Sequence, residues 1–384
     1  MASRNGNHSP DSAARVRPRR LIRLHPREDS FEVSQGRTVL STNLCGFITP
    51  NTASGLFVYQ TRILSCYRWL LDDKEPLAVA LSNVEQHSWL GYYIQLPRSV
   101  NIDREDRGSG AMAAVSERSL ELRLSRSVGY GVHEDVDLTN FTQGQATFQL
   151  ELEVDADFAD QEETQHQRQQ FGDLERFWRC NQQDDWELFF DYFAHHHPEH
   201  QGDIRDASIH RSLTIEVENC SSEPHSSGKA ITFQVSLKPL QSWHTCICMY
   251  PKVEEEPSFP LYGCYAFQPS TNIFDASRAA FLAESTQFSS PASETLTPVV
   301  VGALEQARHD LAALRLHDLD HNEHAWVPAA GIPIYLALFG RDKGPVRPQG
   351  MRIRELQQKM GGTIPTAVSL TVIASARLYS RRLM

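Results

Sequence analysis

The stretch "ATFQLELEVD" (residues 146–155) decides the fold class of this chain. Apolar side chains recur at every second position, and polar or charged side chains occupy most positions between them. The apolar set is Phe148, Leu150, Leu152 and Val154. A period of two buries one face of a strand and leaves the other in water, which is typical of an antiparallel sheet.

The same alternation recurs on both sides of this stretch. It is found in "SLELRLSRS" at residues 119–127, "SLTIEVEN" at residues 212–219 and "ITFQVSLKPL" at residues 231–240. Turn-forming Gly, Asn, Asp and Pro separate such segments from about residue 31 to residue 251. Many short strands divided by turn signals predict a mainly β fold, an antiparallel β-sandwich.

The pattern changes after Pro251. The segment "TPVVVGALEQARHDLAALRLHD" (residues 297–318) offers Thr297 as a helix N-cap and Pro298 as the first helical residue. Its apolar residues Val300, Leu304, Ala307, Leu311 and Leu314 recur at helical spacing. Residues from about 276 onward are therefore expected to be mainly helical.

Composition restricts the partners. The 384 residues are 40% hydrophobic and 22% charged, as in a globular protein, and the net charge is −11. A strongly acidic chain is a poor non-specific binder of nucleic acid, whereas a neutral sugar is not repelled. No apolar run approaches the roughly 18 residues that suggest a membrane helix, so no membrane partner is expected.

The cysteines and the N-terminus indicate a cytoplasmic protein. Seven cysteines, an odd number at irregular spacing, predict reduced thiols without a metal or cofactor. Cys246 and Cys248 should share one face of a strand as small, half-buried side chains. Residues 1–28 are expected to form a disordered basic tail, with a transit peptide as the alternative. "HHHPEH" (residues 195–200) is interpreted as a solvated loop rather than a metal site.

Four short motifs stand out in order along the chain. They are "GLF" with "TRILS" within residues 55–65, "DFAD" at residues 157–160, "DLAALR" at residues 310–315 and "AGIPIYLALFGRD" at residues 330–342. Together they make the chain resemble the bacterial amylo-α-1,6-glucosidase, or glycogen-debranching enzyme, family.

This resemblance implies the domain organisation. In the family, a supersandwich-like β-sandwich precedes an (α/α)6, or six-hairpin, barrel that performs glycoside hydrolysis. The expected boundaries are 1–28 for the tail, 29–270 for the sandwich, 271–325 for linker helices and 326–384 for a truncated start of the barrel. The chain would then be the N-terminal portion of a debranching-type protein of carbohydrate metabolism.

The resemblance also implies the site residues. Arg341 and Asp342 would bind hydroxyl groups of a terminal sugar, with an ion pair at a helix end as the alternative. Tyr335 and Trp326 would stack on a pyranose ring, with core packing as the alternative. An α-glucan or oligosaccharide is therefore the expected ligand.

Some positions depart from the family pattern. Gln60 stands where an Asp is usual, and Ile334 where an aromatic residue is frequent. After residue 342, "KGPVRPQGMRIRELQQKMGG" does not continue the barrel, and Pro345 and Pro348 would break a helix there. Leu336, Leu338 and Phe339 would then be partly exposed, or capped by tail helices near residues 355–360 and 366–383. Self-association through this helical stub is expected.

Hydrolysis of a glycosidic bond needs two carboxyl groups on opposite sides of that bond. The family takes this acid and base from later barrel loops, so no catalytic residue is predicted and the chain alone should be inactive. Two alternatives remain open. One is a non-catalytic carbohydrate-binding or scaffolding sandwich, which would carry aromatic side chains on its solvent face. The other is an enzyme completed by a second polypeptide.

One ion pair is also predicted within the sandwich. Arg62 of the "TRILS" motif and Asp160 of the "DFAD" motif are expected to pair and to organise the sheets, rather than to contact a ligand.

Overall fold

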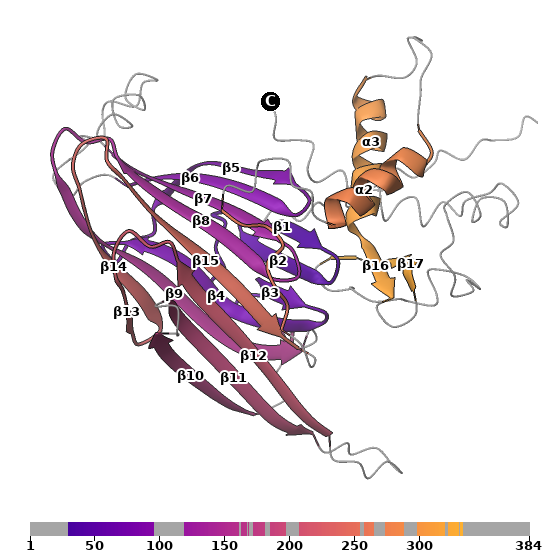
Figure 1. The fold of residues 1–384 in the computed structure, drawn as a ribbon, viewed down its shortest axis with the longest axis horizontal. Coiled ribbons are helices and arrows are strands. Elements are labelled where there is room, and N and C mark those ends of the chain that lie inside the picture. The colour runs from indigo at the N-terminus through magenta and orange to yellow at the C-terminus, as the bar shows by residue number, and fades with distance from the viewer. Residues whose placement is uncertain are drawn as a thin grey trace, which may run out of the picture.

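The described part of the chain folds as two antiparallel sheets packed face to face, with helices α2 and α3 and a small hairpin beside them (Figure 1). This computed structural model describes residues 30–95, 119–160, 163–166, 168, 172–180, 185–196, 207–253, 257–264, 273–287, 298–318, 322–329 and 331–332. The prediction of a mainly β fold with an antiparallel sandwich is confirmed.

The first sheet has seven strands in the order β1-β2-β3-β4-β9-β14-β13. Their bounds are β1 Ser30–Gln35, β2 Thr38–Asn43, β3 Gly55–Val58, β4 Thr61–Leu71, β9 Ala146–Asp160, β13 Pro224–Ser227 and β14 Ala230–Leu237.

The second sheet has eight strands in the order β10-β11-β12-β15-β8-β7-β6-β5. Their bounds are β5 Leu77–Glu85, β6 Ser88–Gln95, β7 Leu120–Val128, β8 Val132–Asn140, β10 Asp173–Cys180, β11 Trp186–His196, β12 Ala207–Glu218 and β15 Ser242–Lys252.

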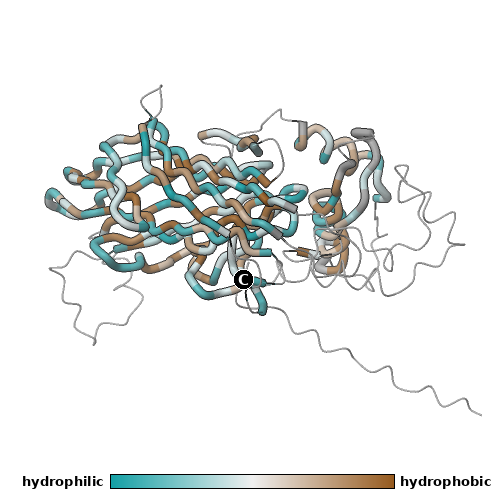
Figure 2. Tube along the Cα trace, turned by 90° about the horizontal axis from the view of Figure 1, so that it is seen from below, coloured by the Kyte–Doolittle hydropathy of each residue, from teal (hydrophilic) through white to brown (hydrophobic). Residues whose placement is uncertain are grey.

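The core lies between the two sheets. Strand β9 lies inside the first sheet between β4 and β14, and its apolar positions from Phe148 to Val154 are buried. They pack against apolar residues of the opposite sheet, including Leu122, Leu138 and Ile215. Figure 2 shows the alternation of hydrophobic and hydrophilic positions along the strands. Burial of the apolar face is the main driving force for this arrangement.

A buried ion pair sits inside this apolar layer. Arg126 of β7 and Glu134 of β8 are direct neighbours across the strand pair, and both side chains are almost fully buried. The Arg126 Nε donates to Glu134 Oε2. Tyr67 and Trp69 of β4, in the opposite sheet, both donate to Glu134 Oε1 at 2.7 Å. The carboxylate therefore joins the two sheets through charge-assisted hydrogen bonds.

The turn around Gly46 completes this cluster. The Arg126 guanidinium donates to the Gly46 carbonyl and lies 4.7 Å from the centre of the Trp89 ring. Gly46 has a φ of 78°, and a Cβ there would lie 2.8 Å from the Tyr93 hydroxyl and still closer to the Trp89 ring. Only glycine fits, because other residues would add both backbone strain and a collision.

The helices follow the sandwich. They are α2 Ile273–Glu284 and α3 Pro298–Ala313, and α3 begins at the proline that the sequence indicates. Arg308 of α3 donates to the Leu282 carbonyl and to Ser285 Oγ, which holds the two helices together. In the part of the chain that the structure describes, neither helix has the length and apolarity needed to span a bilayer.

The residues after α3 differ from the helical expectation. They form an antiparallel hairpin of β16 Arg315–Asp318 and β17 Asn322–Pro328. Leu316 and Ala329 pack against Val39 and Phe57 on the outer face of the first sheet. As part of a strand, Leu316 reaches this apolar patch. The helical spacing of apolar residues ends at residue 314, and tertiary packing decides the structure after it.

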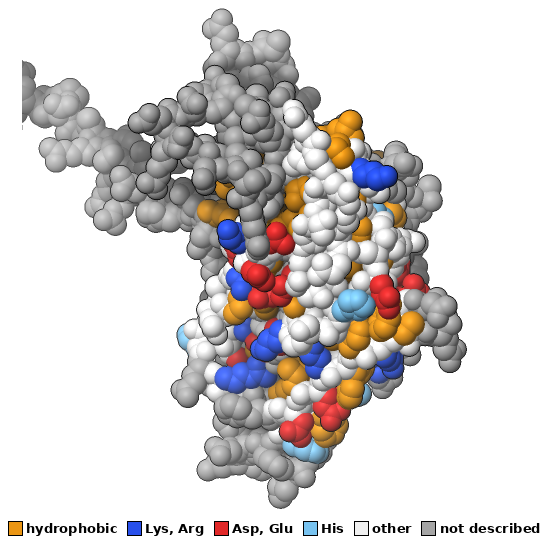
Figure 3. Space-filling view, turned by 90° about the vertical axis from the view of Figure 1, so that its left-hand side faces the viewer, with side chains coloured by type: hydrophobic (Ala, Val, Ile, Leu, Met, Phe, Trp, Pro, Cys, Tyr) orange, Lys and Arg blue, Asp and Glu red, His pale blue; other side chains and the backbone are white. Residues whose placement is uncertain are grey.

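The helices also contact the turn between β5 and β6. Gln86 of this turn donates to Asp310 of α3, and Arg278 of α2 donates to Glu85 at 3.4 Å. Beside them, His87 stacks on Tyr262 with ring centres 4.6 Å apart. Figure 3 shows the end of the sandwich that lies opposite the helices. Acidic and basic side chains are interspersed on it, and hydrophobic side chains form small groups.

The buried ion pair yields a stability prediction. Glu134→Gln keeps an oxygen that can accept from Tyr67 and Trp69 but leaves Arg126 as an unpaired buried charge. We expect a loss of about 3–5 kcal/mol in the free energy of unfolding, measured by urea titration. The double variant Arg126→Met/Glu134→Gln removes both charges and should lose clearly less. Equal losses in the two variants would show that the charge itself is unimportant.

A second prediction concerns acid stability. Burial, reinforced by the Arg278 charge and opposed by Asp275, lowers the pKa of His87 from 6.5 to about 4. Between these values the unfolded chain binds more protons, so stability rises with pH and is lost on acidification. Between pH 6.5 and pH 5, His87 should contribute about 1.5 kcal/mol of this loss.

The variant His87→Phe keeps a ring against Tyr262 and cannot titrate. Urea unfolding at the two pH values should therefore show a smaller acid loss in this variant, by about that amount. His225 supplies a matched control, because it is a histidine with an exposed side chain. The variant His225→Gln should therefore leave the acid loss unchanged. A His87→Phe variant with the wild-type acid loss would refute the assignment.

Candidate functional site

The predicted sugar-binding residues fall mostly outside the described residues. Tyr335, Arg341 and Asp342 lie there. Trp326 is described on β17 and is half-buried. Its ring packs edge-on against Phe281 of α2 at 5.6 Å, and the Arg315 guanidinium lies 5.9 Å from the ring centre. This position leaves part of the indole open, and sugar contact by Trp326 stays a prediction.

The predicted pairing of Arg62 with Asp160 is wrong. Arg62 Nε and Nη2 donate to the carboxylate of Asp157, three residues earlier, and Arg62 Nη1 donates to the Thr52 carbonyl at 2.7 Å. Asp160 instead accepts from Arg211 of β12 at 3.2 Å. The β4–β9 register shifts near residues 62–66, and Phe158 has a φ of 49°, so a simple alternation gives the wrong partner.

A polar network covers the outer face of the eight-stranded sheet, the side turned away from the core. His244 of β15 and Arg123 of β7 both pair with Asp137 of β8. Asp137 Oδ1 lies 2.8 Å from His244 Nδ1, and Asp137 Oδ2 accepts from Arg123 Nη2 at 2.6 Å. Burial alone would raise the pKa of Asp137, but these hydrogen bonds outweigh it and lower the pKa. The same hydrogen bond between His244 and Asp137 has the opposite effect on the histidine, because it raises the pKa of His244.

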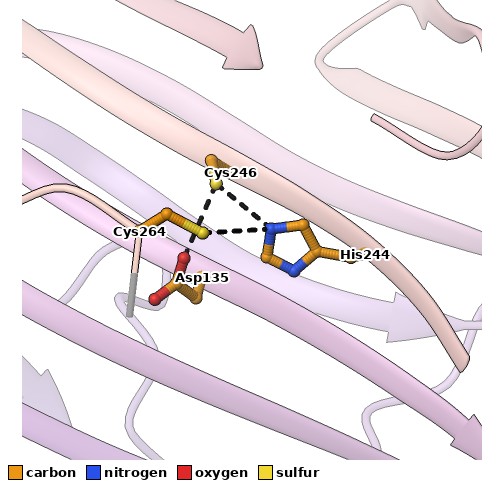
Figure 4. A group of neighbouring side chains, drawn as sticks. All are labelled: Asp135, His244, Cys246 and Cys264. Carbon is orange, nitrogen blue, oxygen red and sulfur yellow. Dashed lines mark hydrogen bonds between the residues drawn. The ribbon is translucent and has the colours of Figure 1, made fainter. Parts of the chain in front are cut away.

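Next to this network lies a group of four side chains of the types that can ligate a metal ion, Asp135, His244, Cys246 and Cys264 (Figure 4). We call it the metal-ligating group. Their ligand atoms all lie within 4.8 Å of one another. His244 Nε2 is 3.3 Å from Cys246 Sγ and 3.5 Å from Cys264 Sγ. Asp135 Oδ1 lies 3.5 Å from Cys246 Sγ.

The environments of these four side chains differ. Asp135 and Cys246 are buried, His244 is half-buried and Cys264 is exposed. Burial raises the pKa of Cys246 well above its ordinary value, although a contact from Asn219 opposes the effect. Although Cys264 is exposed, partial desolvation of its thiol raises the pKa to about 11, with the hydrogen bond and charge of Asp135 as further causes.

Cys248 extends the polar network along β15. It lies on the same face as Cys246, as predicted from their spacing, but both side chains are buried rather than half-buried. His133 Nδ1 is 3.2 Å from Cys248 Sγ, and His133 Nε2 is 3.2 Å from Asp135 Oδ1. The seven cysteines are all free in the structure. Within the "HHHPEH" motif, His195 ends up exposed on β11, and residues 197–200 lie outside the described residues.

An aromatic row crosses the same outer face. The strand register aligns Phe177 of β10 with Phe189 of β11, then Thr214 of β12, then Tyr250 of β15. The Phe177 and Phe189 rings stack with centres 6.3 Å apart, and Phe259 packs edge-on against Tyr250 at 5.7 Å. Phe177 is 46% exposed and Phe259 is 60% exposed. We call Phe177, Phe189, Tyr250 and Phe259 the aromatic row.

Polar groups flank the aromatic row. Tyr250 donates to Glu218 Oε1 at 3.2 Å. Burial and the neighbouring Glu218 charge raise the pKa of Glu216. A hydrogen bond with Tyr250 lowers it, but by less. Arg179 of the edge strand β10 donates to Glu187 of β11 at 2.8 Å. Carboxylates and guanidinium groups beside exposed rings can exchange hydrogen bonds with ligand hydroxyls.

Comparison with protein-family models identifies the sandwich. A model described as the N-terminal domain of (some) glycogen debranching enzymes matches residues 33–248. The chain belongs to this family. The match runs from β1 into β15, so the debranching-enzyme N-terminal domain comprises both sheets of the sandwich. The resemblance to the debranching-enzyme family is therefore confirmed for the N-terminal domain, while the motifs at residues 310–315 and 330–342 lie beyond the matched range.

The remaining comparisons add little about function. A search of curated proteins found no match. A galactose mutarotase-like protein of Clostridium acetobutylicum shares 8% identity with a TM-score of 0.30, covering 59% of this chain and 95% of that one. A human-microbiome protein assigned as a kojibiose phosphorylase shares 7% identity with a TM-score of 0.43, covering 75% of this chain and 39% of that one. Similarities of this size carry no functional argument.

Sequence reasoning missed the two assemblies on the outer face of this debranching-enzyme domain. The local signal that could have indicated the metal-ligating group is the His244-x-Cys246 spacing, which places a histidine and a cysteine on one face of a strand. Asp135 joins them only because β8 pairs with β15, which places Asp135 opposite Cys246. The aromatic row likewise depends on the register of four strands, and no local pattern in the sequence shows it.

Proposed function

We propose that this chain is a non-catalytic, glucan-binding N-terminal domain of a debranching-type protein of carbohydrate metabolism. One observation carries the proposal. This chain belongs to a family named for glycogen debranching, and its own aromatic row lies on the solvent face of the sandwich, as expected for a carbohydrate-binding module. The ligand would be a branched α-glucan or an oligosaccharide.

The chemistry of the aromatic row suits a sugar. A pyranose ring has an apolar C–H face that packs on an aromatic ring, while its hydroxyls seek hydrogen bonds at the rim. Phe177 and Phe259 offer exposed rings, and Glu216, Glu218 and Arg179 supply acceptors and donors beside them. The net charge of −11 does not oppose a neutral ligand.

Residues in and near the barrel motif would form a second sugar contact in this proposal. Trp326, Tyr335, Arg341 and Asp342 would bind the terminal sugar at the entrance to a helical catalytic domain, and the aromatic row would hold a more distant part of the glucan. The domain would work in the cytoplasm, which its seven free cysteines favour. Self-association through the residues after 326 remains part of the proposal.

Binding can be tested on the aromatic row. Phe177→Ala removes an exposed ring, and we expect the dissociation constant for glycogen or maltoheptaose to rise about two- to tenfold, as for the loss of one aromatic contact. Isothermal titration calorimetry and affinity electrophoresis in glycogen gels would measure it.

Phe141 gives the matched control, because it is 37% exposed and lies outside the aromatic row. Phe141→Ala should bind like the wild-type chain. Absence of binding to any α-glucan at millimolar concentration would refute the proposed function, and equal losses in both variants would refute the placement of the glucan on the row.

The catalytic part of the proposal has its own test. Purified chain incubated with glycogen or a branched dextrin should release no glucose above the rate without protein. The reason is that hydrolysis needs two opposed carboxyl groups, which the family resemblance assigns to later barrel loops. Glucose release measured by a coupled enzymatic assay, abolished by heating the protein, would contradict the assignment of a non-catalytic domain.

A further inference from the structure

We propose that Asp135, His244, Cys246 and Cys264 form a structural zinc site that fastens the segment 257–264 to the outer face of the eight-stranded sheet. This proposal reverses the expectation from sequence that the chain holds no metal. It is independent of the glucan-binding function, because the four side chains lie outside the aromatic row.

Three of the six distances between ligand atoms fit one tetrahedral ion, and all six are at most 4.8 Å. With zinc–sulfur distances near 2.3 Å and zinc–nitrogen distances near 2.0 Å, neighbouring ligands lie roughly 3.5 Å apart. The sulfur–nitrogen distances from His244 are 3.3 Å to Cys246 and 3.5 Å to Cys264, and Asp135 lies 3.5 Å from the Cys246 sulfur. Figure 4 shows the two thiols and the carboxylate gathered on the Nε2 side of the His244 ring.

The surrounding residues orient these ligands as in known zinc sites. A ligating histidine usually donates its second ring N–H to a carboxylate, which fixes the ring and its tautomer. His244 Nδ1 makes this contact with Asp137 at 2.8 Å, so a neutral ring directs the Nε2 lone pair at the thiols. Arg123 holds Asp137 from the other side. The Asn219 amide donates to the Cys246 sulfur at 3.7 Å, as expected around a thiolate.

The type of ligand selects the metal. Two thiolates, one imidazole and one carboxylate form a mixed sulfur, nitrogen and oxygen set that suits Zn²⁺, while Mg²⁺ and Ca²⁺ prefer oxygen ligands only. Four protein ligands would fill a tetrahedral shell and leave no open position for a substrate. The site is therefore assigned a structural role rather than a catalytic one.

The chain segments that meet here define this role. Asp135 lies on β8, His244 and Cys246 lie on β15, and Cys264 belongs to the segment that leads towards α2. This segment already touches the sheet, because Ser258 N donates to the Pro251 carbonyl and Gly131 N donates to the Phe259 carbonyl. A metal ion would add a strong link at its C-terminal end, next to Tyr262, whose ring stacks on His87.

The test uses the full chain, reduced with a phosphine and freed of metal by a chelator. We expect one equivalent of Zn²⁺ per chain and an increase in melting temperature with zinc. We also expect Co²⁺ to produce a thiolate-to-metal charge-transfer band and the visible bands of tetrahedral cobalt. Failure of the reduced chain to take up stoichiometric Zn²⁺ or Co²⁺ would overturn the proposal.

Two variants locate the site. Cys264 is exposed, so Cys264→Ser should keep the fold, while zinc affinity falls more than the roughly 10–100-fold typical of second-shell changes. Asp137→Asn should still bind one zinc ion per chain, with an affinity that is lower by about 10–100-fold. Cys180→Ser is the matched control, since Cys180 is also exposed and lies on β10, and it should bind zinc normally.

The histidine tract at residues 195–200 is the competing source of metal binding. A variant with His195→Gln, His197→Gln and His200→Gln should keep the stoichiometric zinc and the cobalt bands. Metal uptake that survives Cys264→Ser but disappears in the histidine variant would move the binding to the tract and overturn the proposal.

Discussion

The arrangement of the sandwich depends on one buried carboxylate. Glu134 pairs with Arg126 on the neighbouring strand and accepts hydrogen bonds from Tyr67 and Trp69 on the opposite sheet. An ionised group away from water is tolerated only when its partners are in place. Alignments that separate Glu134 from Arg126, Tyr67 or Trp69 are therefore disfavoured.

The strand register also decides what faces solvent. Side chains alternate along a strand, so Glu134 can point into the core only if Asp135 and His133 point outwards. Pairing with β15 then brings Asp135 opposite Cys246, and Asp137 opposite His244. A shift by one residue would exchange the two faces and disperse the metal-ligating group. The core ion pair and the outer network are thus two consequences of one strand alignment.

The sequence was informative wherever a local period controlled the structure. Alternation in residues 146–155 correctly predicted β9, and Pro298 marked the start of α3. It failed where non-local contacts decided the outcome. Leu316 joined a strand because Val39 and Phe57 offered an apolar surface, and Arg62 paired with Asp157 because β9 is irregular near Phe158. The metal-ligating group unites residues from 135 to 264, which only the folded sheet brings together.

The ion pair also has a consequence for the order of folding. Arg126 and Glu134 are eight positions apart on a single hairpin, whereas Tyr67 is 67 positions from Glu134. The hairpin can therefore form early, with its charges still hydrated, because local contacts close short loops. Bringing β4 onto it strips that water away, so the desolvation of one carboxylate coincides with the docking of the sheets.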